Sequence, residues 1–355
     1  MRIPELGLIE GFYGRSWSWR ERAEAVGFLG ARGYRFYLYA PKADPFLRRR
    51  WREPHPEADA RALAALGESC RAAGVRLGVG LSPFEAWLGF DHAARAALAT
   101  KIGALDDAGI DDLAVLFDDM RGDVPDLADR QLEIVDFVRQ RTRARRIIVC
   151  PSYYSDDPVL DRVFGARPAG YLERLGAGLP PEVEVFWTGE EVVSRELSIA
   201  HLRTVGALLG RKPFLWDNYP VNDGQRMSQY LHLRAFTGRS AAIADHVAAH
   251  GINAALQPTL TRIPALTLRD AYELGEDYAY GVAFRRAAAQ VMGPELGERL
   301  RDDLLMLQDV GLDRLGERAA ALRERWDGVD HAAAREIVAW LDGVYRITDE
   351  IVHTQ

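Results

Sequence analysis

Cysteine is nearly absent from this sequence of 355 residues, which contains only Cys70 and Cys150. The two lie far apart in the chain, and neither belongs to a C-x-x-C pair or to a cluster of metal ligands. A disulfide scaffold needs more cysteines than this, so the sequence excludes that class of protein. Because such scarcity is typical of a reducing compartment, we expect a cytoplasmic protein.

Long apolar runs are missing as well. No window approaches the roughly 20 consecutive apolar residues that span a bilayer. The stretch from Met1 to Glu10 carries two acidic residues and no long apolar core, so it does not resemble a signal peptide. We therefore expect no association with a membrane.

Positive charge and metal ligands are also in short supply. The net charge is -7, which argues against a broad surface for nucleic acid, and the basic runs 48–50 and 141–146 are short enough to be solvated. The pair His246-x-x-x-His250 has the spacing of one helical face, but two ligands are too few for a metal site. We place this pair on a solvated helix and expect neither a metal nor another cofactor.

The sequence does contain a regular alternation of short apolar runs with amphipathic helical segments, which is typical of parallel βα units. Eight units predict a closed (β/α)8 barrel of the α/β class over residues 1–265. Residues 266–355 are rich in Ala, Arg, Leu and Glu at helical spacing, and they predict an all-helical C-terminal region. The expected strands are Leu6–Phe12, Arg35–Ala40, Arg76–Leu81, Asp112–Phe117, Arg146–Pro151, Glu182–Trp187, Lys212–Trp216 and Asn253–Gln257.

Polar and aromatic residues follow six of these strands, at the end of a barrel where active sites form. Aromatic rings interleaved with carboxylates and amides suit a sugar, which offers C–H faces for stacking and hydroxyls for hydrogen bonds. A phosphate site would need several cations, and Lys42 is alone. The strand ends are 10–14, 39–42, 118–119, 150–154, 187–189 and 216–218, the last followed by Asn222 and Asp223.

Asp118 and Asp119 directly follow the apolar residues of the fourth strand. Adjacent carboxylates repel each other, so we expect a coupled pair that holds one proton to higher pH, as a general acid requires. A helix cap or a surface turn remains the alternative. Neighbouring residues do not easily straddle a sugar ring, and they better suit a substrate whose own 2-acetamido oxygen is the nucleophile.

At these residues the sequence resembles the family 84 glycoside hydrolases, which include bacterial N-acetylglucosaminidases and O-GlcNAcases. The matching motifs keep the family's order from about residue 5 to 260. They are Glu10-Gly-Phe-Tyr-Gly-Arg15, Tyr39-Ala-Pro-Lys42, Trp51-Arg-Glu53, Leu116-Phe-Asp-Asp119, Cys150-Pro-Ser-Tyr-Tyr154, Trp187-Thr-Gly189, Val192-Val-Ser194, Trp216-Asp-Asn218 and Asn222-Asp223.

The resemblance implies a retaining exo-β-N-acetylglucosaminidase that acts on GlcNAc-bearing glycoconjugates or glycoproteins through an oxazoline intermediate. Asp118 would orient the acetamido group, and Asp119 would serve as general acid and then general base. The implied sugar contacts are the 3-hydroxyl for Gly11 and Lys42, the acetamido oxygen for Tyr154, the anomeric region for Asn218, and the 4- and 6-hydroxyls for Asp223. Trp187, Thr188, Val192 and Trp216 would line the acetamide pocket, with Cys150 beneath it. Phe12 and Tyr13 are further candidates for substrate binding, and packing at the barrel mouth is the alternative for Tyr13 and Trp216.

One departure concerns the eighth strand, where the family usually has Asn-Pro and this chain has Gln257-Pro258. That Asn helps to bind the 4-hydroxyl, so the preference for GlcNAc over another N-acetylhexosamine depends on how Gln257 fits. A catalytically silent barrel that binds GlcNAc-bearing proteins is the other alternative. The apolar stripe Ile337, Trp340, Leu341, Tyr345 and Ile347 is either a homodimer interface or a surface packed on the chain's own barrel.

Overall fold

The computed structural model describes residues 2–355, apart from the side chains of residues 352–354. Eight parallel strands form a closed barrel in which neighbours in sequence are neighbours in the sheet and β8 pairs with β1. The predicted fold class is therefore confirmed. The strands are β1 (Glu5–Glu10), β2 (Tyr34–Tyr39), β3 (Arg76–Leu81), β4 (Asp112–Leu116), β5 (Arg146–Cys150), β6 (Glu184–Trp187), β7 (Phe214–Asp217) and β8 (Ala249–Asn253).

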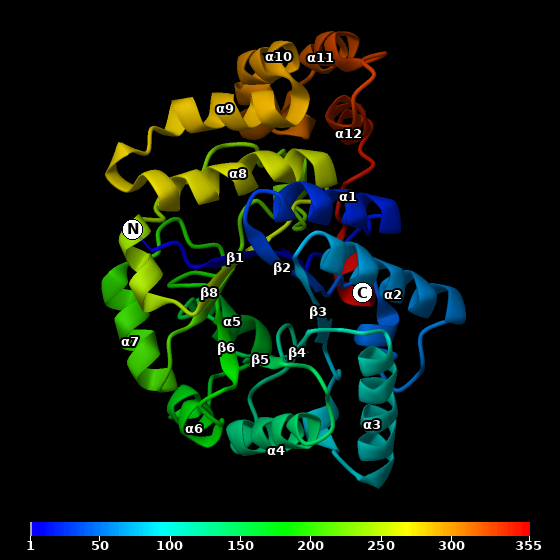
Figure 1. Ribbon diagram of the computed structural model, residues 1–355, viewed down its shortest axis with the longest axis vertical. Coiled ribbons are helices and arrows are strands. Elements are labelled where there is room, and N and C mark those ends of the chain that lie inside the picture. The colour runs from blue at the N-terminus through cyan, green and yellow to red at the C-terminus, as the bar shows by residue number, and fades with distance from the viewer. Residues whose placement is uncertain (1) are drawn as a thin grey trace.

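A ring of helices surrounds the strands (Figure 1). Strand residues are buried almost throughout, because the helices cover the outside of the barrel and side chains fill its interior. The filling is tight: a β-carbon at Gly7 of β1 would lie 2.1 Å from the ring of Phe36 on β2. The helices of the ring are α1 (Trp19–Gly30), α2 (Glu57–Ala72), α3 (His92–Asp107), α4 (Leu127–Arg139), α5 (Pro158–Phe164), α6 (Tyr171–Gly178), α7 (Ile199–Leu209) and α8 (Pro258–Leu274).

The eighth strand lies earlier than predicted. It covers Ala249–Asn253, so the prediction of Asn253–Gln257 was wrong except at its first residue. His250 was expected on a solvated helix, but it lies on β8 with 0% of its surface exposed. Its ring hydrogen-bonds the hydroxyl of Tyr272 at 2.8 Å and the carboxylate of Asp217 at 3.0 Å, and these partners allow a polar residue inside the barrel wall.

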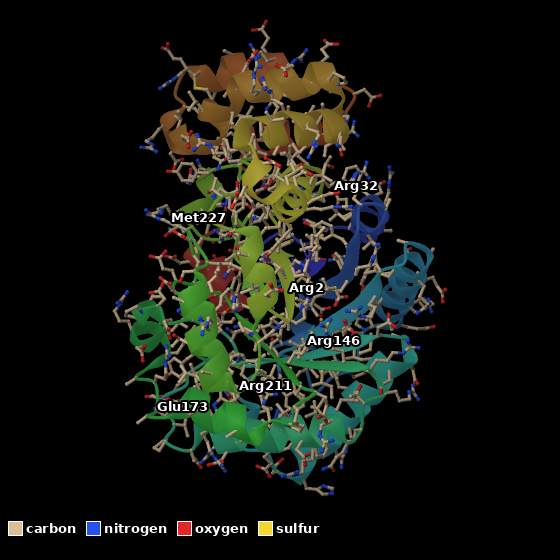
Figure 2. All side chains as sticks on the ribbon, turned by 60° about the vertical axis from the view of Figure 1, so that its left-hand side comes forward. Arg2, Arg32, Arg146, Glu173, Arg211 and Met227 are labelled. Carbon is tan, nitrogen blue, oxygen red and sulfur yellow. The ribbon has the colours of Figure 1, made fainter. Side chains whose placement is uncertain are left out.

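The basic runs are solvated as predicted at most positions, since Arg49, Arg50, Arg141, Arg143 and Arg145 are exposed, but the prediction is wrong for Arg48 and Arg146. Arg146 begins β5 and pairs with Glu184 and with Glu5, and Figure 2 labels it in the barrel half of the molecule, away from the C-terminal helices. Arg48 is buried behind the mouth of the barrel. Ion pairs hold Arg146, and the aromatic rings of Tyr13 and Phe84 lie against Arg48. A count of charges along the sequence does not reveal such partners.

The C-terminal helices form a layer over α8 (Figure 1). They are α9 (Tyr280–Met292), α10 (Pro294–Leu305), α11 (Arg318–Trp326) and α12 (Ala332–Leu341). The last helix, α13 (Asp349–Thr354), lies in the barrel half (Figure 1). The expected boundary between residues 265 and 266 falls inside α8, so the division into two domains stays a prediction. No helix in the described part of the chain is both long enough and apolar enough to cross a membrane.

The apolar stripe of the C-terminal region packs within the chain. Ile337, Trp340, Tyr345 and Ile347 are buried, and the indole N–H of Trp340 donates to the carbonyl of Ser228 at 3.3 Å. Of the two alternatives for the stripe, the structure has the packed surface. A homodimer through the C-terminal helices stays a prediction.

Candidate active site

A cavity of about 280 Å³ opens at the carboxyl ends of the strands. Seven of the eight strands or the loops that follow them contribute to it, and only β3 does not. The lining residues are Gly11, Tyr13, Lys42, Asp118, Asp119, Cys150, Tyr154, Thr188, Val192, Val193, Trp216, Asn218, Val221, Asp223, Gly224 and Asn253.

The two adjacent carboxylates meet a single lysine in this cavity. The Lys42 Nζ lies 2.5 Å from Asp118 Oδ2 and 3.0 Å from Asp119 Oδ2. The hydroxyls of Tyr13 and Tyr154 donate to the two oxygens of Asp119 at 3.0 and 3.1 Å. Asp118 Oδ1 is buried and has no hydrogen-bond partner among the described residues, so it is an acceptor available to a bound molecule.

The charges around Asp119 work against the protonated form. Burial raises the pKa of its carboxyl, but the Lys42 ammonium and the Arg48 guanidinium outweigh burial and lower the pKa to about 2. This differs from our expectation of a pair that holds one proton to higher pH. The expectation rested on repulsion between two adjacent carboxylates, and the sequence did not show that two cations converge on Asp119.

The pKa of Asp223, which lies in the loop after β7, is shifted in the other direction. Burial raises the pKa of its carboxyl to about 6, and the nearby negative charge of Asp119 adds to the effect. Its Oδ2 accepts a hydrogen bond from the backbone N–H of Tyr13 at 2.9 Å. Asp223 therefore connects the loop after β1 to the loop after β7, and it lines the cavity.

The indole of Trp216, which is nearly buried, forms one wall of the cavity. It lies so close to the chain after β1 that a β-carbon at Gly11 would be 2.1 Å from the ring, which explains the glycine at this position. An aromatic wall beside carboxylates and amides offers stacking and directional hydrogen bonds together, as a pyranose requires.

A chain of amide hydrogen bonds crosses the side of the cavity. The backbone N–H of Gly11 donates to Asn253 Oδ1 at 3.1 Å, and Asn253 Nδ2 donates to Asn218 Oδ1 at 2.9 Å. Asn218 Nδ2 in turn donates to the carbonyl of Val192 at 2.8 Å. These bonds fix the side chains of both asparagines relative to β1, β7 and β8.

A buried ion pair lies behind this wall. Arg239 donates two hydrogen bonds to Asp217, at 2.7 and 2.8 Å, and two more to the carbonyls of Ser194 and Arg195 at 2.7 and 2.6 Å. His250 approaches the same carboxylate from β8. The network therefore connects the ends of β7 and β8 to the loop that carries Val192.

Three predicted site residues do not line the cavity. Phe12 is buried against Trp17, and the Trp187 indole N–H hydrogen-bonds His201 at 2.9 Å. Gln257 is buried, and its Oε1 accepts from Asn222 Nδ2 at 3.0 Å. The other predicted residues, from Gly11 to Asp223, are brought together as expected.

Four lining residues were not singled out from the sequence: Asn253, Val193, Val221 and Gly224. Asn253 ends β8, and it was visible as a polar residue after an apolar pair, but the strand had been placed four residues too late. The amide that we sought at Gln257 is at Asn253. The described residues contain no group of three or more His, Cys, Asp and Glu side chains arranged to hold a metal ion.

Comparison with known proteins agrees with this geometry. The sequence model of the beta-N-acetylglucosaminidase family matches residues 6–307. The mouse and rat proteins named protein O-GlcNAcase are each 29% identical over 246 residues, which is 67% of this chain and 26% of each relative. The chain thus spans about a quarter of the length of these relatives.

Among solved structures, a mutant of an O-GlcNAc hydrolase from Thermobaculum terrenum is similar, with a TM-score of 0.79 and 27% sequence identity. The match covers 95% of this chain and 80% of that protein. It therefore includes the C-terminal helices as well as the barrel.

Proposed function

This chain belongs to the β-N-acetylglucosaminidase family of glycoside hydrolases, and from that premise we propose that it is a retaining exo-enzyme that removes terminal β-linked GlcNAc through an oxazoline intermediate. The observation that carries the proposal is the pair Asp118 and Asp119, with Asp118 Oδ1 buried in the cavity without a partner. Such an oxygen can accept the N–H of a substrate acetamido group.

In the first step, Asp118 would hold the acetamido N–H so that the carbonyl oxygen of the same group attacks the anomeric carbon. The proton of Asp119 would pass to the glycosidic oxygen as the bond to the anomeric carbon breaks. In the second step, Asp119 would take a proton from water, and the resulting hydroxyl would open the oxazoline. Two displacements retain the configuration at the anomeric carbon.

Lys42 connects substrate binding to this chemistry. Lys42 pairs with both aspartates and so favours the ionised form of Asp119. A sugar 3-hydroxyl that accepts a hydrogen bond from Lys42 would draw the ammonium away, and the exclusion of water by the sugar would then favour a protonated Asp119. We propose that the enzyme gains its general acid only when the sugar is bound.

The remaining lining residues would set sugar specificity. Tyr154 would contact the acetamido oxygen, and Thr188, Val192 and Trp216 would enclose the acetamide methyl group with Cys150 beneath it. Asp223 and Asn253 supply the oxygen and amide groups suited to the 4- and 6-hydroxyls. We propose a preference for GlcNAc, and we assign to Asn253 the contact that the sequence had led us to expect from Gln257.

We further propose O-GlcNAc on protein Ser or Thr as the substrate, and the cytoplasm as the place where it is met. Three relatives named for O-GlcNAc removal support this choice. Rates on aryl β-GlcNAc, aryl β-GalNAc and a GlcNAc-modified peptide, measured side by side, test both the sugar and the aglycone.

The central test is turnover of a nitrophenyl β-GlcNAc by the full chain and by Asp118→Asn. We expect the wild type to release nitrophenol and to form the β-anomer of free GlcNAc first, as seen by proton NMR. Asp118→Asn should lose at least about 100-fold in kcat, because the amide cannot polarise the nucleophile. Asp136→Asn, an exposed substitution on α4, is the matched control. A wild type that binds GlcNAc without turnover would establish the silent barrel instead.

A further inference from the structure

Arg48 is a buried cation directly behind the candidate general acid. It follows the short helix η1 (Pro45–Leu47), it is 4% exposed, and it does not line the cavity. Its Nη2 lies 3.3 Å from the hydroxyl of Tyr13 and 3.3 Å from the backbone carbonyl of Asp119. Its Nε and Nη1 have no hydrogen-bond partner among the described residues.

A guanidinium held in this way is costly, because a buried charge needs partners that replace water. Two aromatic rings supply part of the compensation: the guanidinium carbon lies 5.7 Å from the ring centre of Tyr13 and 5.2 Å from that of Phe84. No carboxylate is paired with Arg48 in the described part of the chain. An arginine kept here despite the cost points to a role beyond packing.

Both side-chain hydrogen bonds of Arg48 lead to Asp119. Arg48 donates to the Tyr13 oxygen, so the Tyr13 proton is directed to Asp119 Oδ2, where the hydroxyl donates at 3.0 Å. Arg48 also holds the carbonyl of Asp119, whose backbone has a φ of 55°. This left-handed conformation is unfavourable for a residue other than glycine, so it depends on contacts that hold it.

We propose that Arg48 is a positioning residue for the general acid: it fixes the backbone and the hydroxyl partner of Asp119, and it remains beside Asp119 as a cation after the sugar has drawn Lys42 away. The proposal rests on the function proposed above. Because Arg48 lies outside the cavity lining, a bound sugar can displace Lys42 but does not reach Arg48.

The effect on the reaction follows from the charge balance of the first step. When Asp119 gives its proton to the glycosidic oxygen, the electron pair of the broken O–H bond stays on Asp119 as a carboxylate. Arg48 stabilises that carboxylate and so makes Asp119 a stronger acid. The titratable and charged groups that face Asp119 are Asp118, Asp223, Lys42, Arg48, Tyr13, Tyr154 and Cys150. Once Lys42 has turned to the sugar, Arg48 is the cation that remains in this group.

The test uses Arg48→Gln and two aryl β-GlcNAc substrates, one with a good leaving group (dinitrophenyl) and one with a poor leaving group (methoxyphenyl). We expect the basic limb of the kcat profile, which reports the enzyme–substrate complex, to move up by about one pH unit, because Asp119 holds its proton more tightly. We expect about a tenfold loss of kcat/KM on the methoxyphenyl substrate and less than about a threefold loss on the dinitrophenyl substrate, which needs little acid assistance.

Arg50→Gln is the matched control, because Arg50 belongs to the same basic run but is half-exposed and pairs with Glu53. Arg50→Gln should change neither the basic limb of the pH profile nor kcat/KM on either substrate. A double-mutant cycle with Tyr13→Phe adds a second readout: if Arg48 acts through Tyr13, the two losses should be clearly less than additive.

The opposite outcome for Arg48→Gln is an equal loss of kcat/KM on both substrates, with the basic limb of the pH profile unmoved. If the variant also has a normal thermal transition, this result would show that Arg48 only supports the fold. If Arg48→Gln does not fold, Arg48→Lys carries the test. Lysine keeps the positive charge but lacks the several N–H donors of the guanidinium. A larger loss of kcat/KM on the methoxyphenyl substrate than on the dinitrophenyl substrate supports the proposal, and equal losses overturn it. Failure of the proposed function would appear separately, as an Asp118→Asn variant that keeps full activity.

Discussion

At the scale of single residues, Asp119 shows how neighbours decide the chemistry of a carboxyl group. The same side chain is close to two cations, accepts from two tyrosine hydroxyls and follows another aspartate. The two cations outweigh burial and lower the pKa of this carboxyl, so they favour its ionised form. In the mechanism proposed above, the substrate creates the general acid by drawing Lys42 away.

If Asp119 protonates the leaving oxygen, Asp119→Ala should depend on the leaving group. We expect a loss of about 100- to 10,000-fold in kcat/KM on the methoxyphenyl substrate, which is the range typical of acid–base catalysis. The loss on the dinitrophenyl substrate should be much smaller, because its leaving oxygen departs without a proton. Steady-state rates on both substrates give the result, and uniform loss would show that the roles are misassigned.

Sequence reasoning located most of this site because its residues are contiguous motifs at strand ends. Asp118, Lys42, Trp216 and Asp223 each follow an apolar run, and the barrel brings such positions together. It did not find Arg48, which looks like part of a solvated basic run. Nothing local in the sequence indicates that this arginine turns inward between Tyr13 and Phe84, because those contacts come from distant segments.

At the scale of elements, β8 was the strand that the sequence concealed. Its residues 249–253 include His250 and Asn253, so the usual apolar pattern of a buried strand is interrupted twice. The following stretch from Ala254 to Leu256 is more apolar and looked more like a strand. His250 belongs in the barrel wall because Tyr272 and Asp217 satisfy both ring nitrogens, and these partners lie on other elements.

The buried ion pair between Asp217, at the end of β7, and Arg239 should contribute strongly to the stability of the fold. Asp217→Asn leaves the buried Arg239 without its counter-charge, and we expect a loss of about 3–5 kcal/mol in the free energy of unfolding at pH 7. Urea unfolding measures it, with the exposed Asp245→Asn as the matched control. A loss below about 1 kcal/mol would contradict the assignment of this pair as a main support of the wall.

The same variant has a defined pH dependence. Burial raises the pKa of Asp217, but Arg239 and His250 outweigh burial and lower it from 3.8 to about 2. A lowered pKa in the folded state means that the carboxylate stabilises the fold above pH 3.8, and that this contribution is lost as pH falls toward 2. The difference in unfolding free energy between wild type and Asp217→Asn should therefore narrow below about pH 4.

At the scale of the whole molecule, the C-terminal helices and the barrel are connected on two sides. Glu336 of α12 accepts from the backbone N–H groups of Thr259 and Leu260 at 2.8 and 2.9 Å, and so caps the start of α8. The chain then returns to the barrel face, where Gln355 accepts from the backbone N–H of Gly14 at 2.7 Å. Figure 1 shows the C-terminus within the barrel half.

These connections predict that the chain unfolds as one cooperative unit. Trp340 of α12 is fully buried and donates to the carbonyl of Ser228, in the loop that also carries Asp223. Trp340→Ala should lower the free energy of unfolding by about 3–5 kcal/mol. The urea transition, followed by far-UV circular dichroism, should stay single and move to lower urea.

Val344→Ala is the matched control for this experiment, because Val344 lies in the same region but is 44% exposed. It should leave the midpoint almost unchanged, since little apolar surface is lost from the interior. Two separate transitions in Trp340→Ala, with the main one where the wild type unfolds, would show that the barrel is stable without the helical layer. The barrel and the helical region would then be two separate domains. A single transition shifted to lower urea would instead show that α8 joins the barrel and the helical region into one folding unit.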